Sequence, residues 1–435
     1  MQRDIYSKLL NWKATSGRKP LLLRGARQTG KTWLLKAFGK TEYDSLVYLN
    51  FEEDPRLKGF FEGRVRPAEI LENLAVYVGR QIRPERDLIV FDEIQAADGA
   101  LKSLKYFYEN APQYHIAGAG SLLGISLSGP GAFPVGKVNF LDLYPLTFLE
   151  FLSATGSDEL RQYLARIREP RPLPEPFHGE LIAKLRTYYF TGGMPEAVAH
   201  YVETGDLTGV RKIQSDILTA YALDFAKYAA TPDIPKLRML WEAIPRQLAK
   251  ENKKFMFSLL KKSARIRDFE NSLEWLEKSG LILRAFRVSA ARHPLSAYRE
   301  DNIFKIYALD VGLLAALAGI DPAAMIQGER VFREYEGAMV ENYVATQLVA
   351  GSGANLYYWQ SGGIAEVDFV CEHGSRVLPL EIKAGGNPKS KSLQSFDNKY
   401  NPPVLARTTL LNLKKETRII NIPLYGISLF PEICR

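Results

Sequence analysis

Cysteine is scarce in this chain: Cys371 and Cys434 are the only two among 435 residues. Two cysteines cannot build the disulfide framework of a small secreted protein, and they do not supply the ligand set of a zinc cluster. The segment Cys371-Glu372-His373 is therefore predicted to be an ordinary turn and not a metal site.

Long hydrophobic runs are absent as well. The longest candidate covers residues 308–320, which falls short of the roughly 18 apolar residues that cross a bilayer, and Asp310 interrupts it. We expect a core helix there. The opening residues Met1-Gln2-Arg3 do not lead into the apolar segment of a signal peptide. The sequence thus predicts a cytoplasmic protein with no membrane partner.

What the chain does have is an ordinary globular composition and a basic charge. Hydrophobic residues make up 46% and charged residues 24%, and 435 residues exceed the about 250 at which one core stops growing, so two or three domains are expected. The net charge of +8 makes a nucleic-acid partner plausible. One basic cluster stands out, and a solvated face is an equal alternative for it. It contains Lys253, Lys254, Lys261, Lys262, Arg265 and Arg267.

A complete GxxxxGK[ST] motif follows the apolar run Leu21-Leu22-Leu23. Its residues are Gly25, Ala26, Arg27, Gln28, Thr29, Gly30, Lys31 and Thr32. In such a loop the backbone N–H groups and the N-terminus of the following helix face the phosphates of a nucleotide. Lys31 is suited to the β- and γ-phosphates, and the Thr32 hydroxyl to Mg²⁺. The motif predicts binding of ATP with Mg²⁺.

A second apolar strand, residues 88–91, ends in Asp92 and Glu93. Asp92 is expected to hold the Mg²⁺ shell, and Glu93 to polarise the water that attacks the γ-phosphate. A third strand leads through residues 114–120 to Ser121, which we expect beside the γ-phosphate. A plain Gly-Ser loop is the alternative for Ser121. With a further strand at residues 46–51, these segments predict a parallel α/β sheet with the ligand at its carboxyl edge.

The middle of the chain reads as helical. Prolines alternate along residues 170–176 and separate the nucleotide domain, with its extension at residues 143–152, from this helical region. Pro195 is suited to the first turn of a helix. Residues 213–229 have helical periodicity, and we expect one buried side there. Its members are Ile217, Tyr221, Leu223 and Phe225.

Helices followed by strands at residues 281–288 and 304–307 resemble a winged helix. Such a unit often places a helix in the DNA major groove, but it serves equally as a packing module between domains. The basic cluster only slightly favours DNA.

A second group of candidate site residues lies in the last hundred residues. The order there is helix, three strands, helix and further strands. Glu381 and Lys383 share one side of a strand, because side chains alternate with period two, and Asp368 is expected at a neighbouring strand end. With Glu341 from the helix, these carboxylates are suited to one or two Mg²⁺, and Lys383 to orienting water. The alternatives are a degenerate core that no longer cuts, or merely charged strand ends.

This last arrangement resembles the PD-(D/E)xK nuclease core, although Val367 and not proline precedes Asp368. The chain as a whole resembles bacterial and archaeal AAA-superfamily ATPases that carry a C-terminal domain of unknown function. The resemblance rests on seven segments. They are Leu22 to Thr32, Phe91-Asp92-Glu93-Ile94-Gln95, Ala119-Gly120-Ser121-Leu122-Leu123-Gly124, Tyr144-Pro145-Leu146-Thr147-Phe148, Gly192-Gly193-Met194-Pro195-Glu196, Glu366-Val367-Asp368-Phe369 and Glu381-Ile382-Lys383.

The resemblance implies a multidomain α/β protein with four parts. They are a P-loop ATPase domain (1–155), a helical lid (156–235), a winged helix (236–325) and a restriction-endonuclease-like α/β domain (326–435). It also implies a catalytic arginine, supplied either by another subunit of a homo-oligomer or by a neighbouring domain; no arginine can be assigned to that role.

Three hypotheses follow for the function. The first is an Mg²⁺-dependent ATPase that couples its nucleotide state to DNA engagement. The second is a nucleotide-switched regulatory or binding protein whose nuclease-like domain is inactive. The third is an ATP-gated, metal-dependent nuclease.

Overall fold

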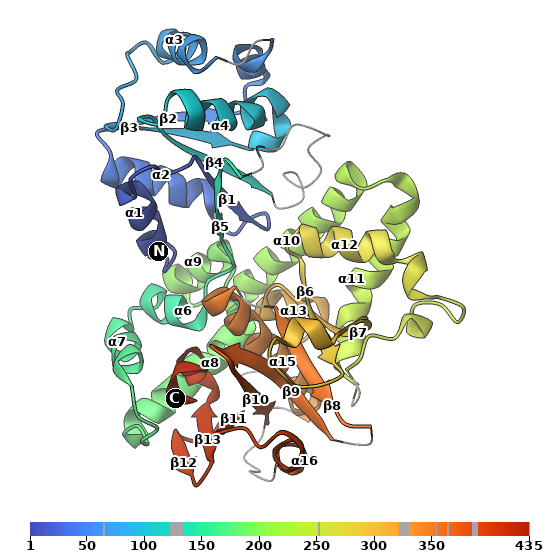
Figure 1. Cartoon of the computed structure of the whole chain (residues 1–435). Helices are drawn as coiled ribbons and strands as arrows, with labels where there is room; N and C mark the ends of the chain where they lie inside the picture. The colour runs from blue at the N-terminus through green and yellow to red at the C-terminus, as the bar shows by residue number, and fades with distance from the viewer. Residues whose placement is uncertain are drawn as a thin grey trace. The chain divides into compact units, whose positions relative to one another are not determined.

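The computed structural model describes residues 1–63, 66–121, 134, 136–250, 253–321, 330–353, 355–362, 365–384 and 390–434. For Ser121 and residues 330–334 it describes the backbone alone. The chain divides into two compact units (Figure 1). One contains residues 2–144 with 278–280, and the other contains residue 1, 145–277 and 281–435.

A five-stranded parallel sheet forms the centre of the first unit. Its order is β2-β3-β4-β1-β5, and every neighbouring pair is parallel. The strands are β1 (Leu21–Gly25), β2 (Ser45–Asn50), β3 (Asp87–Asp92), β4 (His115–Ser121) and β5 (Asn139–Asp142). The strands expected at residues 46–51, 88–91 and 114–120 are therefore confirmed as β2, β3 and β4.

Helix α1 precedes β1, and three further α-helices with two 3₁₀ turns lie between the described strands. The helices are α1 (Tyr6–Ala14), α2 (Lys31–Glu42), α3 (Pro67–Val78) and α4 (Asp98–Asn110), and the turns are η1 (Pro55–Phe61) and η2 (Ile94–Ala96). Parallel strands need such crossover connections, because the chain must return to the same end of the sheet before each new strand begins.

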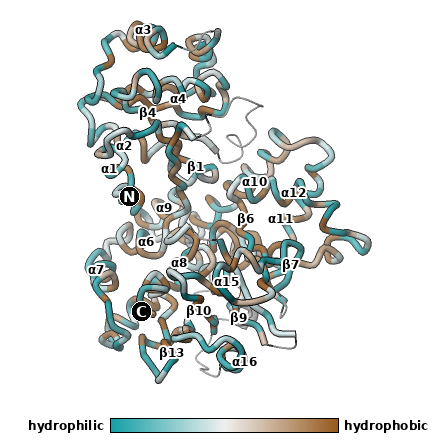
Figure 2. The backbone as a smooth tube through the Cα atoms, viewed as in Figure 1, coloured by the Kyte–Doolittle hydropathy of each residue, from teal (hydrophilic) through white to brown (hydrophobic). Residues whose placement is uncertain are grey.

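The centre of the sheet is buried on both faces, which explains why β1 and β3 read as nearly continuous apolar runs. Leu22, Ile89 and Phe91 belong to one core cluster, whereas Leu21 and Val90 belong to the other. Successive side chains of a strand point to opposite faces, so each run supplies both cores. In Figure 2 the tube is correspondingly brown along β1.

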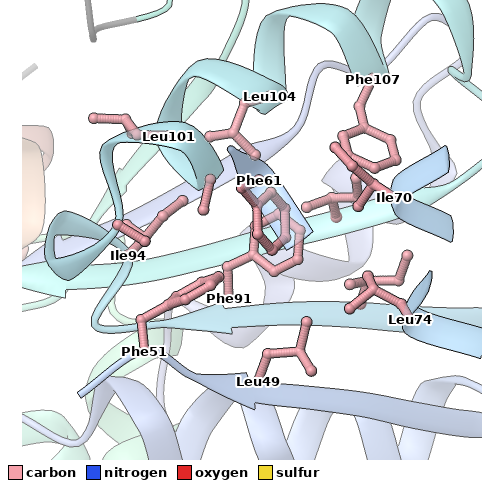
Figure 3. Packing of buried hydrophobic residues seen from close by; sticks show 14 of the residues in the cluster. Leu49, Phe51, Phe61, Ile70, Leu74, Phe91, Ile94, Leu101, Leu104 and Phe107 are labelled. Carbon is pink, nitrogen blue, oxygen red and sulfur yellow. The ribbon is translucent and has the colours of Figure 1, made fainter. Parts of the chain in front are cut away.

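Aromatic rings dominate one of these cores. Phe91 from β3 contacts Phe61 with ring centroids 5.3 Å apart and Phe51 at 5.8 Å, both edge to face. Phe107 from α4 and Leu49 from β2 surround them (Figure 3). This packing fixes β3, and therefore the Asp92-Glu93 pair at its end, on the rest of the sheet.

The second unit is helical around a second sheet. Its helices are α6 (Phe148–Ala154), α7 (Asp158–Arg166), α8 (Glu175–Thr191), α9 (Pro195–Thr204), α10 (Leu207–Tyr228), α11 (Ile234–Leu248), α12 (Glu270–Lys278), α13 (Val311–Leu317), α15 (Arg330–Ser352) and α16 (Lys391–Tyr400). Pro195 opens α9 as predicted. The buried side of α10 contains Ile217, Tyr221 and Phe225, but the prediction for Leu223 is wrong, since it is 66% exposed. A residue two positions from Tyr221 lies on another side of the helix.

Two of the segments that carried the resemblance contact each other in this unit. The Gly193 carbonyl accepts a hydrogen bond from the Leu146 N–H at 2.7 Å, and the Gly193 N–H donates to Asp310 at 2.6 Å. A Cβ at position 193 would lie 2.1 Å from the Leu146 oxygen, so no larger residue fits. Asp310 also caps α13, which is the core helix expected near residues 308–320. These motifs therefore have a structural role.

The second sheet has eight strands in the order β12-β13-β11-β10-β9-β8-β6-β7. They are β6 (Ile282–Val288), β7 (Arg299–Ala308), β8 (Leu356–Gln360), β9 (Glu366–His373), β10 (Arg376–Ile382), β11 (Leu405–Thr409), β12 (Lys414–Glu416) and β13 (Ile419–Pro423). Cys371 lies within β9, so the turn predicted for residues 371–373 is wrong; the chain turns immediately afterwards, at residues 374–375.

This sheet departs from the predicted domain limits. The β6–β7 hairpin, expected as the wing of a separate domain, pairs in parallel with β8 and belongs to the C-terminal sheet. Residues 145–155, expected in the nucleotide domain, pack within the second compact unit, and the limit of that domain at residue 155 stays a prediction. The sequence of a hairpin does not show which further strand it will pair with, because that partner is set by tertiary contacts. No helix in the described ranges is long and apolar enough to cross a membrane.

Candidate functional site

The GxxxxGK[ST] segment forms a tight turn between β1 and α2. Gln28 and Gly30 have φ angles of 64° and 92°, in the left-handed region, which turns the chain back over the end of the sheet. At Gly25 a Cβ would lie 2.3 Å from a backbone oxygen of Leu143, so only glycine fits. The buried Thr29 hydroxyl donates to the Ala26 carbonyl at 2.9 Å, and Arg27 lies 3.8 Å from Glu52.

Helix α2 begins at Lys31 with its N-terminal amides directed at this turn. No side-chain cap occupies them among the residues described here, since Gly30 is the N-cap. The first N–H groups of a helix have no partner within the helix, and together with the helix dipole they favour a bound anion. The turn therefore offers a phosphate site made of backbone.

Lys31 lies inside the turn and is only 8% exposed. Its ammonium donates to the Gly25 and Ala26 carbonyls at 3.0 and 2.8 Å. Burial lowers the pKa of Lys31 to about 8, against the opposing effect of Glu93 and Asp92. The cation is thus held in place before any phosphate arrives, and negative charge beside it would restore its ordinary pKa.

Thr32 and Asp92 meet at the edge of the sheet. The Thr32 hydroxyl donates to Asp92 Oδ2 at 2.7 Å, and the Tyr48 hydroxyl donates to the same oxygen at 2.6 Å. Hydroxyl and carboxylate oxygens are the ligands that Mg²⁺ prefers, so Thr32 and Asp92 fit that ion. Sequence reasoning missed Tyr48. Tyr48 lies two residues before Asn50, and Asn50 pairs with Asp92 in the parallel register. A tyrosine near the end of the neighbouring predicted strand was the available sequence signal.

Glu93 follows immediately in a strained backbone conformation. Its φ of 49° is left-handed, which is uncommon for a residue with a Cβ and clusters at functional sites. Burial raises the pKa of Glu93 above its ordinary value. Its carboxylate accepts a hydrogen bond from the Gln95 side-chain amide, a second contact that sequence reasoning missed.

Ser121 ends β4 and pairs with Gly25 in the parallel register, so its backbone lies next to the phosphate turn. Its side chain, and the following Leu122-Leu123-Gly124 segment, lie outside the described residues. The role expected for Ser121 stays a prediction.

The second group of predicted residues comes together in the C-terminal sheet, but not as a set of metal ligands. Glu341 on α15 is buried and accepts hydrogen bonds from Lys305 at 2.9 Å and from the Tyr307 hydroxyl at 2.5 Å; Lys253 also contacts it. Glu381 pairs with Lys383 at 2.9 Å. In the described part of the chain, no group of three or more His, Cys, Asp or Glu side chains is arranged to hold a metal ion.

Lys305 was not predicted, and it changes the electrostatics of this group. Its side chain is fully buried, with its ammonium 2.7 Å from Glu366 and 4.0 Å from Asp368. Burial alone would lower the pKa of Lys305, but Glu341, Glu366 and Asp368 raise it above its ordinary value. Burial and the Glu341 charge raise the pKa of Asp368 to about 7. An apolar strand with one lysine, Phe304-Lys305-Ile306-Tyr307, was the sequence signal.

The basic cluster is split by the fold. Lys253 points to buried Glu341, whereas Lys261, Lys262, Arg265 and Arg267 are exposed on turns that precede α12. Helix α12 itself has the sequence ENSLEWLEK, which carries three glutamates and one lysine. An acidic helix repels phosphate, so α12 is a poor major-groove reader.

A phosphate turn between the first strand and helix of a parallel sheet, with a Thr-Asp pair at the sheet edge, defines the class of P-loop nucleotide-binding proteins. Comparison with family models agrees for this part of the chain. Residues 17–152 match an AAA domain, residues 182–324 match a domain of unknown function (DUF8612), and residues 336–425 match another (DUF4143). The first unit is therefore built around an AAA-type P-loop ATPase domain.

Several solved structures are similar to this chain at low identity and low TM-score. The Walker-type ATPase PABY2304 of Pyrococcus abyssi is 15% identical with a TM-score of 0.47, over 73% of this chain and 95% of that one. The ORC1 protein of Aeropyrum pernix, solved with DNA, is 14% identical with a TM-score of 0.30, over 75% and 95%. Cdc6p of Pyrobaculum aerophilum is 13% identical with a TM-score of 0.26, over 76% and 96%. No curated protein matches the chain.

Proposed function

We propose that this protein is an Mg²⁺-dependent ATPase that couples its nucleotide state to DNA engagement. The observation that carries the ATPase proposal is the convergence of Lys31, Thr32, Asp92 and Glu93 at one edge of the sheet, beside the N-terminus of α2. Thr32 and Asp92 are joined by a 2.7 Å hydrogen bond across 60 residues of sequence.

Each of these residues has a role in the proposal. The amides of residues 26–32 and the Lys31 ammonium bind the phosphates, and Thr32 with Asp92 holds Mg²⁺. The ion, when bound, neutralises charge on the β- and γ-phosphate oxygens. Glu93 orients the attacking water and accepts its proton. Its contact with Gln95 keeps the carboxylate in a fixed position. Ser121, whose backbone pairs with Gly25, is assigned to the terminal phosphate in this proposal.

The DNA part of the proposal rests on charge. Lys261, Lys262, Arg265 and Arg267 are exposed within seven residues, and each phosphate that such groups neutralise releases counterions. Because α12 is acidic, we place the contact on the turns before it and not in the major groove. Binding of this kind is expected to be insensitive to base sequence and to weaken steeply with salt.

The first experiment is Mg²⁺-ATP hydrolysis by the wild type and by Glu93→Gln, with and without duplex or single-stranded DNA. We expect Glu93→Gln to keep ATP and lose turnover, because the amide cannot accept the proton. Glu62→Gln, an exposed glutamate of the same unit, is the matched control and should retain full activity. Turnover that survives in Glu93→Gln would remove Glu93 from the mechanism, and Lys31→Ala with intact ATP affinity would remove the turn.

A second candidate function is a nucleotide-switched binding protein with an inactive nuclease-like domain. The observation that favours it is the buried Lys305 among the C-terminal carboxylates, which leaves that domain without a visible chemistry. Tight ATP binding by the wild type without turnover, with or without DNA, would support this candidate over the first.

A further inference from the structure

The C-terminal sheet contains a buried ion cluster built from three parts of the chain. Lys305 comes from β7, Glu341 from α15, and Glu366 with Asp368 from β9 (Figure 1). The Lys305 ammonium lies 2.9 Å from Glu341, 2.7 Å from Glu366 and 4.0 Å from Asp368. One cation is thus surrounded by three carboxylates.

An ion held by both Glu341 and Asp368 would lie close to this ammonium. Glu341 and Asp368 are two of the carboxylates expected to hold Mg²⁺, and Lys305 approaches both of them. A metal ion there would face a positive charge at contact distance with no water between them. The residues present therefore do not fit a divalent cation.

The carboxylate oxygens of the predicted metal site mostly contact other groups of the protein. Glu381 binds Lys383 with one oxygen, while its other oxygen is buried and has no hydrogen-bond partner among the described residues. Asp368 uses its second oxygen to accept the Ile382 N–H at 2.7 Å. Glu341 uses its second oxygen for Lys253. Both oxygens of Glu341, and one oxygen each of Asp368 and Glu381, are thus committed to protein donors.

We propose that Lys305 is a built-in counter-ion that occupies the cation position of a nuclease-like carboxylate set, so that the native C-terminal sheet takes no divalent metal and cuts no phosphodiester. The hairpin that supplies Lys305 pairs with β8 at the side of the sheet away from β10. It is therefore the addition of β6 and β7 to this sheet that fills the site.

The balance of charges predicts that removal of Lys305 opens a site for a divalent cation. Lys253 and Lys305 oppose three carboxylates, Glu341, Glu366 and Asp368, when all are ionised. Removing the Lys305 side chain leaves three carboxylates around one lysine and a space where the ammonium was. Oxygen-rich, negatively charged sites of this kind bind Mg²⁺ or Mn²⁺.

The test is the binding of Mn²⁺ alone to the full chain without nucleotide, measured by loss of the free-ion EPR signal. Any Mn²⁺ held at Thr32 and Asp92 is common to all variants, so the differences between variants report the C-terminal sheet. We expect the wild type and Glu366→Gln to bind equally, and Lys305→Ala to gain one Mn²⁺ per chain. Adding Asp368→Asn to Lys305→Ala should abolish the gain.

Lys383→Met is the matched control: it removes a lysine that pairs with Glu381 and is 37% exposed, and it should add no site. A wild-type Mn²⁺ site that Glu366→Gln removes would overturn the proposal, because the lysine would then yield to metal. So would folded Lys305→Ala that gains no Mn²⁺. If Lys305→Ala fails to fold, the comparison of wild type with Glu366→Gln still decides the question.

Cleavage of supercoiled plasmid gives a second readout. We expect no cleavage by the wild type with Mg²⁺ or Mn²⁺, and cleavage that disappears in Asp368→Ala would refute the proposal. Neither measurement involves ATP, so their outcome is independent of the ATPase proposal.

Discussion

The pKa of Lys31 makes nucleotide affinity depend on pH in a range where few other groups titrate. In the free protein burial lowers that pKa to about 8, while a bound phosphate stabilises the protonated form. Binding therefore raises the pKa, and affinity is at its full value below pH 8 and declines as pH rises above it. The perturbation is a change of pH from 7 to 9.

The size of the effect follows from the fraction of free protein with a charged lysine. About nine-tenths of it is charged at pH 7 and about one-tenth at pH 9, so the dissociation constant should increase roughly tenfold, or about 1.4 kcal/mol. At pH 8 each binding event should take up about half a proton. A nucleotide phosphate with its second pKa near 6 is already ionised throughout this range.

The assay is titration calorimetry with ADP in EDTA, at pH 7, 8 and 9, in buffers of different ionisation enthalpy. Lys31→Arg is the matched control, because arginine stays protonated and its affinity should not change over this range. Equal wild-type affinity at pH 7 and 9 without proton uptake would refute the reasoning. So would the same pH dependence in Lys31→Arg, since another group would then be responsible.

Three further predictions concern packing and the metal ligand. Phe91→Ala should lower the free energy of unfolding by about 3–5 kcal/mol, because it empties the centre of an aromatic core, while exposed Val76→Ala should change it by less than about 0.5 kcal/mol; chemical denaturation measures both. Gly193→Ala should lower stability by about 3 kcal/mol, since its Cβ would lie 2.1 Å from a backbone oxygen. Gly179→Ala in α8, where no described atom lies within 4 Å of the new Cβ, should be neutral or stabilising, and calorimetric melting of both variants would expose an error. Thr32→Val should bind ATP without Mg²⁺ as the wild type does but lose the gain in affinity that Mg²⁺ gives; an intact Mg²⁺ effect would exclude Thr32 as a ligand.

Residue spacing was enough to predict four of the five strands of the first unit, β1 to β4, and the residues of its phosphate turn, but not β5. These four strands stand out as short, largely apolar segments, and the candidate residues lie at or shortly after a strand end, so local spacing carried the information. The contribution of Tyr48 was not predicted, because Tyr48 and Asp92 are 44 residues apart and their contact depends on the pairing of β2 with β3. Leu223 was predicted to be buried because it is apolar, but it lies on the exposed side of α10.

The contacts of the C-terminal carboxylates depend on long-range strand pairing that residue spacing does not reveal. The sequence placed Glu341, Asp368 and Glu381 on suitable elements, but it assigned Lys305 to a different domain. Whether such carboxylates hold a metal ion or an ammonium depends on whether the hairpin that carries Lys305 joins the same sheet, and strand pairing is set by long-range contacts. The net charge of a site is the sum of all charged groups within a few ångströms, and residue spacing does not show which groups the fold brings that close.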